Sequence, residues 1–345
     1  MGVTIKDVAR LAGVSPSTVS RVIAGNSRIS HKTAARVREV MVELGYYPNQ
    51  MAQGLVSRTS STLGIVLPRP ADELFLNSFF PELIRGITTR ASRSGYDVLL
   101  TSGASEQEEL AAMRRLTRGG RVDGIVLLRS RDSDPVIDLL QGSGFPHVLI
   151  GRSEAHPDTL SVDTDNVQAG YDVTRHLVAQ GHRRIGFVSG PHALSVSRDR
   201  LSGYRKAMDE FSLPIRPDWI VEGEFLQESG YRAMSFIASI PERPTALIVI
   251  DDIVALGVMR GLTELGYTVP GDFSLASFNN TGFSELVTPP ITSVDIGIYQ
   301  LGYTAAHLLI YTLQEERLPQ RRLIIPHRLM VRESSARISD AVEGR

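Results

Sequence analysis

Carboxylate, amide and guanidinium side chains follow several apolar runs in this 345-residue chain. Arg152 follows HVLIG, Asp251 follows ALIVI, Asn279 follows LASF, and Arg200 lies at the start of a predicted helix. These groups can exchange hydrogen bonds with a neutral polyol, because every sugar hydroxyl both donates and accepts. An aromatic ring such as that of Phe225 can cover the apolar face of a pyranose. The sequence therefore predicts a sugar-binding cleft formed by Phe79, Phe80, Arg152, Asp165, Arg200, Phe225, Asp251 and Asn279.

Each of these residues also has a purely structural interpretation. Asp165, which follows the run LSV together with Asp163, is as suited to cap a helix as to bind a ligand, and so is Asp252. Arg200 could serve only to neutralise Asp251. Phe79 and Phe80 could belong to the core. The conjunction of all these groups at strand ends favours the binding site.

Catalytic and cofactor motifs do not occur in the sequence. The eight histidines show no metal-binding spacing such as HxxxH, and the absence of cysteine excludes disulfides and thiolate chemistry. No GxGxxG follows a strand, and neither GxxxxGK[ST] nor GxSxG is present. We expect no cofactor, no metal and no catalytic residue. An enzyme or a sugar-binding transport protein on the same scaffold remains the alternative.

The elements that must position the cleft alternate between strands and helices from Thr62 onward. Short apolar runs predict buried parallel strands: LGIVL, YDVLL, DGIVLL, HVLIG, RIGFVS, ALIVI and FSLASF. Amphipathic stretches such as FPELIRGITTRASRSG separate them. Open α/β sheets bind ligands at the carboxyl ends of their strands. The region is too long for one sheet, so we expect two sheets with a cleft between them and chain crossings near residues 160, 290 and 319.

The first sixty residues are basic, whereas the remainder is acidic. Residues 1–60 contain eight Lys or Arg and three Asp or Glu, a net charge of +5. The remainder contains 29 bases and 35 acids, a net charge of −6. This asymmetry is typical of a nucleic-acid-binding head on a regulatory or oligomerising body, although a small domain that is basic by chance would show it too.

The segment TIKDVARLAGVSPSTVSRVI predicts a helix-turn-helix. Thr4 can cap the first helix, and Gly13 supplies the left-handed residue of a tight turn. Ser15 can cap the second helix, with Pro16 at its first position. Small Ala9 lets the two helices cross closely. A third helix is expected over residues 31–44.

The second helix is expected to lie in the major groove of DNA. Arg21 can bond a guanine edge or a phosphate, and Pro16 and Ser17 occupy base-reading positions, whereas Thr18 and Ser20 are expected to contact phosphates. The predicted contacts of the head are Thr4, Lys6, Ser15, Pro16, Ser17, Thr18, Ser20 and Arg21.

A short helix over residues 50–57 is expected between the head and the body. It has no obvious core, and the polar run RTSST follows it. It is either a frayed linker or a hinge helix that folds on DNA and wedges a leucine into the minor groove. The candidate contacts in this segment are Asn49, Ala52 and Leu55.

The runs VTIKDVARLAGVSPSTVSRVIAG, ELGYYPNQMAQGL and TLGIVLP resemble the LacI/GalR family of bacterial transcriptional regulators, and the resemblance covers nearly the whole chain. It implies a dimeric, operator-binding regulator with a periplasmic-binding-protein-like sensor. By this resemblance, Arg21 matches the recognition-helix arginine and Leu55 the intercalating hinge leucine, while Pro16 and Ser17 match base-reading positions.

The same resemblance extends to the effector site. Arg200 matches an effector-contacting arginine, and Phe225 matches the aromatic position that packs on the sugar. Asp251 stands where many relatives have Asn, and Asn279 where many have Asp. This swapped pair, with the runs NSFFPELIRGI and SFNN, is most similar to maltose-operon repressors of Gram-positive bacteria. It implies a repressor that binds a near-palindromic operator and responds to maltose or maltodextrin.

The expected organisation has four parts: an all-α helix-turn-helix head (1–46), a hinge helix and linker (47–61), an α/β sensor of two lobes that also dimerises (62–335), and a flexible tail (336–345). The tail lacks a leucine heptad, so no tetramerising coiled coil is expected. Dimer contacts are expected near 79–91 and 252–265. No apolar run or N-terminal signal region points to a membrane or to export, so a cytoplasmic location is expected.

Overall fold

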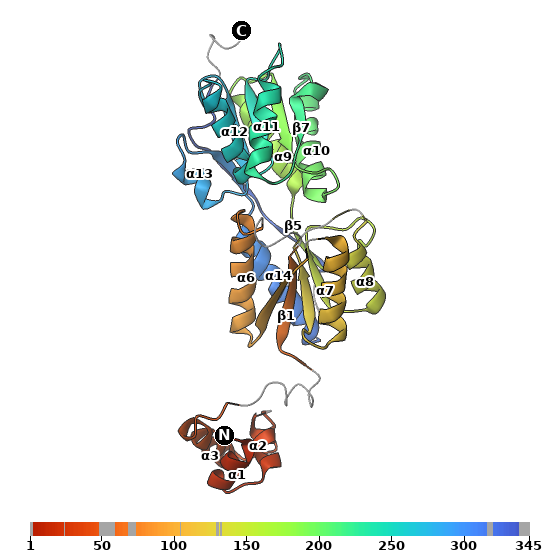
Figure 1. The fold of residues 1–345 in the computed structure, drawn as a ribbon, viewed down its shortest axis with the longest axis vertical. Helices are drawn as coiled ribbons and strands as arrows, with labels where there is room; N and C mark the ends of the chain where they lie inside the picture. Colours follow the sequence, from red (N-terminus) through yellow and green to blue (C-terminus); the bar gives the residue numbers. More distant parts are fainter. Residues whose placement is uncertain are drawn as a thin grey trace. The chain divides into compact units, whose positions relative to one another are not determined.

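The computed structural model describes residues 3–23, 25–47, 59–67, 74–103, 105–128, 131, 133–315 and 320–337. The chain divides into two compact units, Met1–Ser60 and Ser61–Arg345. The described part of the first unit contains the helices α1 (Ile5–Ala12), α2 (Pro16–Ile23) and α3 (His31–Glu43), which are shown in Figure 1.

The three helices of the first unit enclose a small apolar core. Its fully buried members are Val8, Ala9, Val19, Val22, Val37 and Val40. The turn between α1 and α2 forms because Gly13 adopts a φ of 70°, which costs little only for glycine. The hydroxyl of Ser30 accepts the N–H of Thr33 and caps α3. The predicted helix-turn-helix with a third helix is confirmed.

The second unit contains two six-stranded sheets. The first sheet, with its helices, is called lobe 1 and has the strand order β11 (Arg322–Ile325), β5 (Ser161–Thr164), β4 (His147–Ile150), β3 (Gly124–Leu127), β1 (Thr62–Leu67) and β2 (Asp97–Ser102). The second sheet, with its helices, is called lobe 2 and has the order β12 (Arg328–Met330), β10 (Thr292–Asp295), β9 (Ser274–Phe278), β8 (Ala246–Val249), β6 (Ile185–Ser189) and β7 (Ile220–Glu222). All neighbouring strands are parallel except β12, which is antiparallel to β10.

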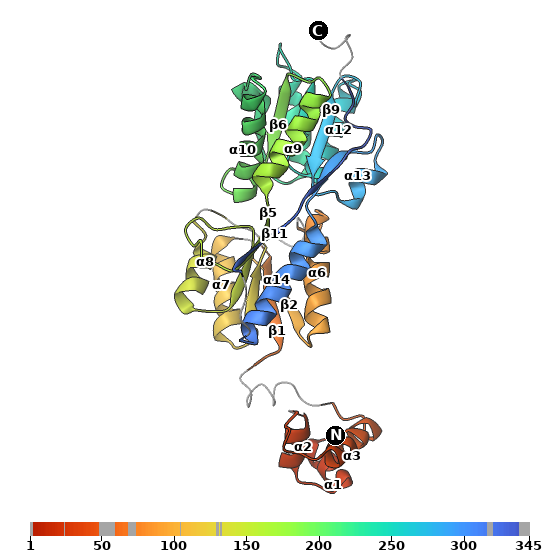
Figure 2. The ribbon, with the colours of Figure 1, turned by 180° about the vertical axis from the view of Figure 1, so that it is seen from behind.

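Helices cover both faces of the lobe 1 sheet (Figures 1 and 2). One face packs against α6 (Phe79–Arg93) and α14 (Ile298–Leu313). The opposite face packs against α7 (Glu106–Arg118) and α8 (Pro135–Ser143). The parallel strands need apolar residues on both faces because both faces are buried.

Lobe 2 carries two close helix pairs. Its helices are α9 (Asn166–Ala179), α10 (Ser195–Glu210), α11 (Gln227–Ile237), α12 (Asp252–Glu264), α13 (Gly282–Leu286) and the short 3₁₀ helix η1 (Pro217–Trp219). In the pair α9 and α10, a Cβ at Gly170 would lie 2.2 Å from the carbonyl oxygen of Arg200, and one at Gly203 would lie 2.0 Å from that of Val167. Glycine at these two positions therefore allows α10, which contains Arg200, to pack closely against α9.

The chain passes between the two lobes three times, from β5 to α9, from β10 to α14 and from β11 to β12. These crossings lie at residues 165, 296–297 and 326–327. The crossings expected near 160, 290 and 319 are therefore placed several residues too early. The strands β5 and β10, which lead into two of the crossings, are short and rich in polar residues such as Asp163, so no apolar run marks where they end.

Two strand predictions differ from the structure. The run YDVLL forms β2, but β2 is an edge strand whose Leu100 is 40% exposed, so it is not buried as expected. The run LSV does not end before Asp163, because this aspartate lies within the buried strand β5. Among the described residues, no helix is both long enough and apolar enough to span a membrane.

Candidate functional site

A cavity of about 580 Å³ is lined by residues of both lobes of the second unit. Six of the eight predicted effector residues line it: Phe79, Phe80, Arg200, Phe225, Asp251 and Asn279. Asp251 and Asn279 follow the neighbouring strands β8 and β9, so the carboxyl edge of the lobe 2 sheet brings them together.

Arg200 lies at the floor of this cavity and is only 2% exposed. Its Nε donates to Asn166 Oδ1 at 3.0 Å, Nη1 donates to the carbonyl of Ile250 at 2.6 Å, and Nη2 donates to Asn279 Oδ1 at 3.2 Å. The guanidinium carbon lies 4.3 Å from the ring centroid of Phe278. Burial lowers the pKa of Arg200 to about 10, so the side chain is still a cation at neutral pH.

Asp251 lies beside Arg200 but receives its hydrogen bonds from other groups. Its Oδ1 accepts the N–H of Ile253 at 2.8 Å and thereby caps α12, while Oδ2 accepts from Asn279 Nδ2 at 2.6 Å and Asn77 Nδ2 at 3.2 Å. Burial raises the pKa of Asp251 to about 6. The alternative in which Arg200 pairs directly with Asp251 is replaced by an indirect link, because the Asn279 amide lies between the two charges.

Further polar residues that were not among the predicted contacts also line the cavity, and three of them, Asn77, Asp163 and Asn166, make hydrogen bonds in its wall. Asn77 precedes α6 in lobe 1, so its bond to Asp251 joins the two lobes. Asn166 Nδ2 donates to Asp163 Oδ1 at 3.2 Å, and burial raises the pKa of this aspartate. The run NSFFPELIRGI contained the signal for Asn77, and the polar residues after LSV contained the signal for the other two.

Aromatic rings supply the apolar part of the cavity wall. Phe79 and Phe80 meet edge to face, with ring centroids 5.2 Å apart, and both also pack against the core. Phe225 lies over Gly190, where a Cβ would come within 2.6 Å of the ring. The cavity thus combines ring faces and edges with convergent donors and acceptors, which is the composition of a small-molecule site.

Arg152 and Asp165 do not line this cavity. Both terminal guanidinium nitrogens of Arg152 contact the carboxylate of Asp199, and the distance from Nη2 to Oδ1 is 2.7 Å. Asp165 Oδ1 accepts the N–H of Gln168 at 2.9 Å and caps α9, which is the structural alternative stated for it. Both residues border a separate polar hollow with Asp199 and Arg322.

In the first unit, the N-terminal end of α2 presents a cluster of hydroxyl groups. Ser15 Oγ lies 2.8 Å from Ser17 Oγ and 2.9 Å from Thr18 Oγ1, and it accepts the N–H of Thr18 at 3.2 Å. Pro16, Ser17, Ser20 and Arg21 are exposed. The predicted DNA contacts of α2 therefore share one accessible surface.

Thr4 and Lys6 are exposed at the start of α1. The Asp7 carboxylate accepts from the N–H of Thr4 at 3.0 Å and from its hydroxyl at 2.7 Å, and these bonds lower the pKa of Asp7. The remaining predicted contacts, Asn49, Ala52 and Leu55, lie outside the described residues.

A helix-turn-helix unit together with a two-lobed, cavity-containing α/β unit defines a ligand-responsive transcriptional regulator with a periplasmic-binding-protein-like sensor. The comparisons with known proteins agree with this class. Residues 4–49 match the model for bacterial regulatory proteins of the lacI family, and residues 174–335 match the periplasmic binding protein-like domain.

Two relatives match the chain almost end to end. The HTH-type transcriptional regulator MalR of Streptococcus pneumoniae is 36% identical over 337 residues, which are 96% of this chain and 99% of the relative. Catabolite control protein A of Priestia megaterium is 35% identical over 336 residues, covering 97% and 100% of the two chains.

A solved structure supports the same assignment. The lac repressor dimer bound to operator and an anti-inducer is 27% identical and superimposes with a TM-score of 0.85, covering 97% of this chain and 100% of that chain. The chain therefore belongs to the LacI family of bacterial regulatory proteins.

Proposed function

We propose that this regulator is a homodimeric repressor that binds a near-palindromic operator through its heads and is controlled by a neutral sugar bound between its lobes. The proposed division is a DNA-binding head (1–46), a hinge (47–61), a sensor and dimerisation body (62–335) and a tail (336–345). Operator binding requires a cytoplasmic location. We infer no catalytic activity, since the relatives are regulators.

The observation that carries the sugar proposal is the charge and hydrogen-bond balance of the cavity. Among the residues that the structure describes, two arginines and four acids line it, so an anionic ligand would meet more negative than positive charge from them. The set is Arg131, Arg200, Glu106, Asp163, Glu224 and Asp251. Carboxylates, amides and a guanidinium group beside aromatic rings suit an uncharged ligand with many hydroxyls. Maltose or a maltodextrin is the first choice, because of the resemblance to maltose-operon repressors.

The proposed control works by linkage between the sugar and the operator. A sugar can release DNA only if it binds the DNA-competent conformation less tightly than another one. Asn77 of lobe 1 bonds to Asp251 of lobe 2 in the wall of the cavity. A sugar that contacts both residues would therefore change the contact between the lobes, which supports a change of lobe closure as the response.

In the head, the proposed contacts divide into two kinds. Pro16 and Ser17 are proposed to read base edges, with Arg21 on a guanine edge or a phosphate. Thr18 and Ser20 are proposed to fix the helix on phosphates. Leu55 is proposed to enter the minor groove at the centre of the operator.

Calorimetric titration of the full-length protein with a panel of sugars tests the effector class. The panel contains maltose, maltotriose, cellobiose, glucose and glucose 6-phosphate. The proposal expects saturable binding of at least one neutral oligosaccharide and weaker binding of the phosphorylated sugar. Preferred binding of glucose 6-phosphate would contradict the neutral-sugar assignment.

A further inference from the structure

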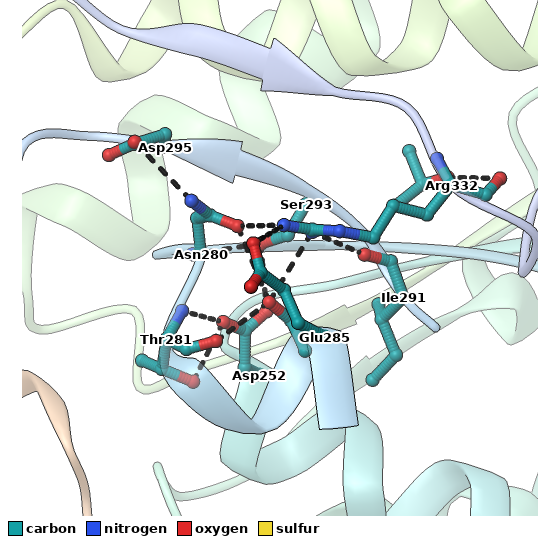
Figure 3. A network of polar contacts seen from close by, with 10 residues as sticks. Asp252, Asn280, Thr281, Glu285, Ile291, Ser293, Asp295 and Arg332 are labelled. Carbon is teal, nitrogen blue, oxygen red and sulfur yellow. Dashed lines mark hydrogen bonds and ion pairs between the residues drawn. The ribbon is translucent and has the colours of Figure 1, made fainter. Parts of the chain in front are cut away.

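Two consecutive asparagines at the end of β9 each bridge a cation and a carboxylate. Asn279 accepts from Arg200 Nη2 at 3.2 Å and donates to Asp251 Oδ2 at 2.6 Å, in the cavity wall. Asn280 Oδ1 accepts from Arg332 Nη2 at 2.7 Å, and its Nδ2 donates to Asp295 Oδ2 at 3.3 Å. Figure 3 shows the Asn280 amide between these two charged partners, neither of which lines the cavity.

The backbone of this turn leaves the two asparagines little independent freedom. Both have positive φ, 97° at Asn279 and 47° at Asn280, a region that asparagine tolerates better than most residues. The N–H of Asn279 donates to the Val294 carbonyl at 2.8 Å, and that of Asn280 donates to Ser293 Oγ at 3.0 Å. A displacement of the Asn279 side-chain amide is therefore expected to displace the Asn280 amide as well.

Buried Asp252 holds the far side of the turn. Its Oδ2 accepts the N–H of Thr281 at 2.6 Å and the Thr281 hydroxyl at 3.0 Å, and its Oδ1 accepts from Ser293 at 2.8 Å and from Ser277. Figure 3 shows Asp252 beside Thr281 and Ser293. The turn is thus fixed on lobe 2 at each residue from 279 to 281.

The partners of Asn280 lead away from the cavity. Asp295 ends β10, and its Oδ1 accepts the N–H of Gly297 at 2.8 Å. Gly297 has a φ of 67°, and α14 of lobe 1 begins at the next residue. Asn280 is therefore linked through two successive hydrogen bonds, by way of Asp295, to Gly297 of the crossing from lobe 2 into lobe 1.

We propose that Asn280 is a positioning residue for the effector response, which couples the state of Asn279 in the cavity to the crossing between β10 and α14. The role rests on the proposed function, in which a ligand in this cavity controls operator binding. Asn280 does not contact the cavity, so its loss should separate the response to the ligand from the binding of the ligand.

The first test needs no ligand and uses hydrogen exchange in the full-length protein. The variant is Asn280→Ala, and the matched control is Glu285→Ala, which removes another Arg332 partner whose side chain is 64% exposed. Loss of the two partly buried amide bonds should accelerate exchange of the Gly297 N–H by roughly tenfold or more. The control should leave that rate within about twofold of wild type. Acceleration confined to residues 279–281, or equal acceleration in both variants, would overturn the coupling.

The second test uses maltose as the probe. Asn280→Ala should bind maltose within about threefold of wild type, whereas maltose should change its operator affinity at least about tenfold less than it changes that of wild type. An unchanged operator response would overturn the proposal, because a merely structural residue predicts no such separation. If Asn280→Ala does not fold, Asn280→Asp, which keeps an acceptor for Arg332 but loses the donor to Asp295, is measured instead with the same expected results. If wild type binds no maltose, the proposed effector is wrong, and hydrogen exchange still decides the role of Asn280.

Discussion

Arg152 of lobe 1 and Asp199 of lobe 2 form an ion pair that joins the two lobes outside the ligand cavity. Both terminal nitrogens of Arg152 contact the carboxylate, and the side chains are 25% and 9% exposed. Asp199 directly precedes Arg200 in α10. The first residue contacts lobe 1, whereas the second lines the cavity.

This ion pair predicts that Asp199→Asn weakens sugar binding, although residue 199 does not line the cavity. In the variant, the lobes would close around the sugar without the bidentate, partly buried contact between Arg152 and Asp199. Because such a contact contributes about 1.5 kcal/mol, sugar affinity should fall roughly tenfold. Calorimetry measures this effect. Glu154→Gln is the control, since Glu154 lies 3.4 Å from Arg152 and is 64% exposed. Equal affinities for wild type and Asp199→Asn would show that the pair does not contribute to closure.

Arg200→Lys tests the buried donor of the cavity. Lysine keeps the charge but cannot reproduce the three separate bonds to Asn166, Ile250 and Asn279. We expect a 10- to 150-fold loss of sugar affinity, the equivalent of about 1.5–3 kcal/mol, with operator affinity unchanged. The comparison variant is Arg198→Lys on the same helix, outside the cavity. Wild-type sugar affinity in a folded Arg200→Lys protein would contradict the site.

Asp251 predicts a pH dependence of stability with a definite sign. Its pKa in the folded protein is raised from 3.8 to about 6, so the folded state binds this proton more tightly than the unfolded state. The contribution of this group to the free energy of unfolding therefore increases as pH falls from 7 to 4, by up to about 3 kcal/mol. Asp251→Asn removes that contribution.

Urea denaturation of wild type and Asp251→Asn at pH 7, 5.5 and 4 measures the difference. The free energy of unfolding of wild type, relative to the variant, should increase at each lower pH. A difference that is constant or decreases with falling pH would mean that Asp251 is not the titrating group.

The sequence predicted the cavity residues that stand at strand ends, because parallel strands bring their carboxyl ends to one edge of a sheet. Asp251 and Asn279 were predicted in this way, whereas Arg200 was predicted from its place near the start of a helix and from the family resemblance. Asn77 could not be assigned, since its bond to Asp251 joins residues 174 positions apart on different lobes. Arg152 was assigned to the cavity because it follows an apolar strand. Nothing local to it shows that Asp199 is the group it meets.

The same limit applies to the strands. Buried runs such as ALIVI predict central strands reliably because both sheet faces demand apolar side chains. The crossing strands carry Asp163 and Arg322, whose charges are stabilised by partners from distant segments. The polar composition of β5 and β10 resembles that of a loop, so the bounds of these two strands could be obtained only from the folded chain.

In the head, Arg21→Ala should weaken operator binding and leave sugar binding unchanged. Loss of a contact to a guanine or phosphate costs about 1–3 kcal/mol, or roughly 5- to 150-fold in affinity. The control is Arg36→Ala, because Arg36 lies on α3 and already pairs with Glu39 at 2.9 Å. Fluorescence anisotropy with an operator selected from random DNA measures both variants. A larger loss for Arg36→Ala than for Arg21→Ala would place the DNA-binding surface elsewhere on the head.

Leu55→Ala tests the hinge at a residue that lies outside the described part of the chain. If paired leucines open a base step at the operator centre, the variant should lose affinity for wild-type operator, and sugar binding should remain. The loss should depend on the central step, because flexible pyrimidine–purine steps cost less to unstack. Operator binding equal to that of wild type would reduce the segment to a linker.

The most direct test of the account is operator release by the sugar that binds most tightly in the calorimetric panel. Anisotropy of a labelled operator is followed as that sugar is added to full-length wild type and to Arg200→Lys. The account predicts that wild type dissociates from the operator at sugar concentrations that saturate its cavity. Arg200→Lys should remain bound to the operator until the sugar concentration is raised by the same factor by which the substitution lowers the sugar affinity. Operator binding that is insensitive to every sugar bound by the wild-type protein would contradict the proposal that the cavity controls the head.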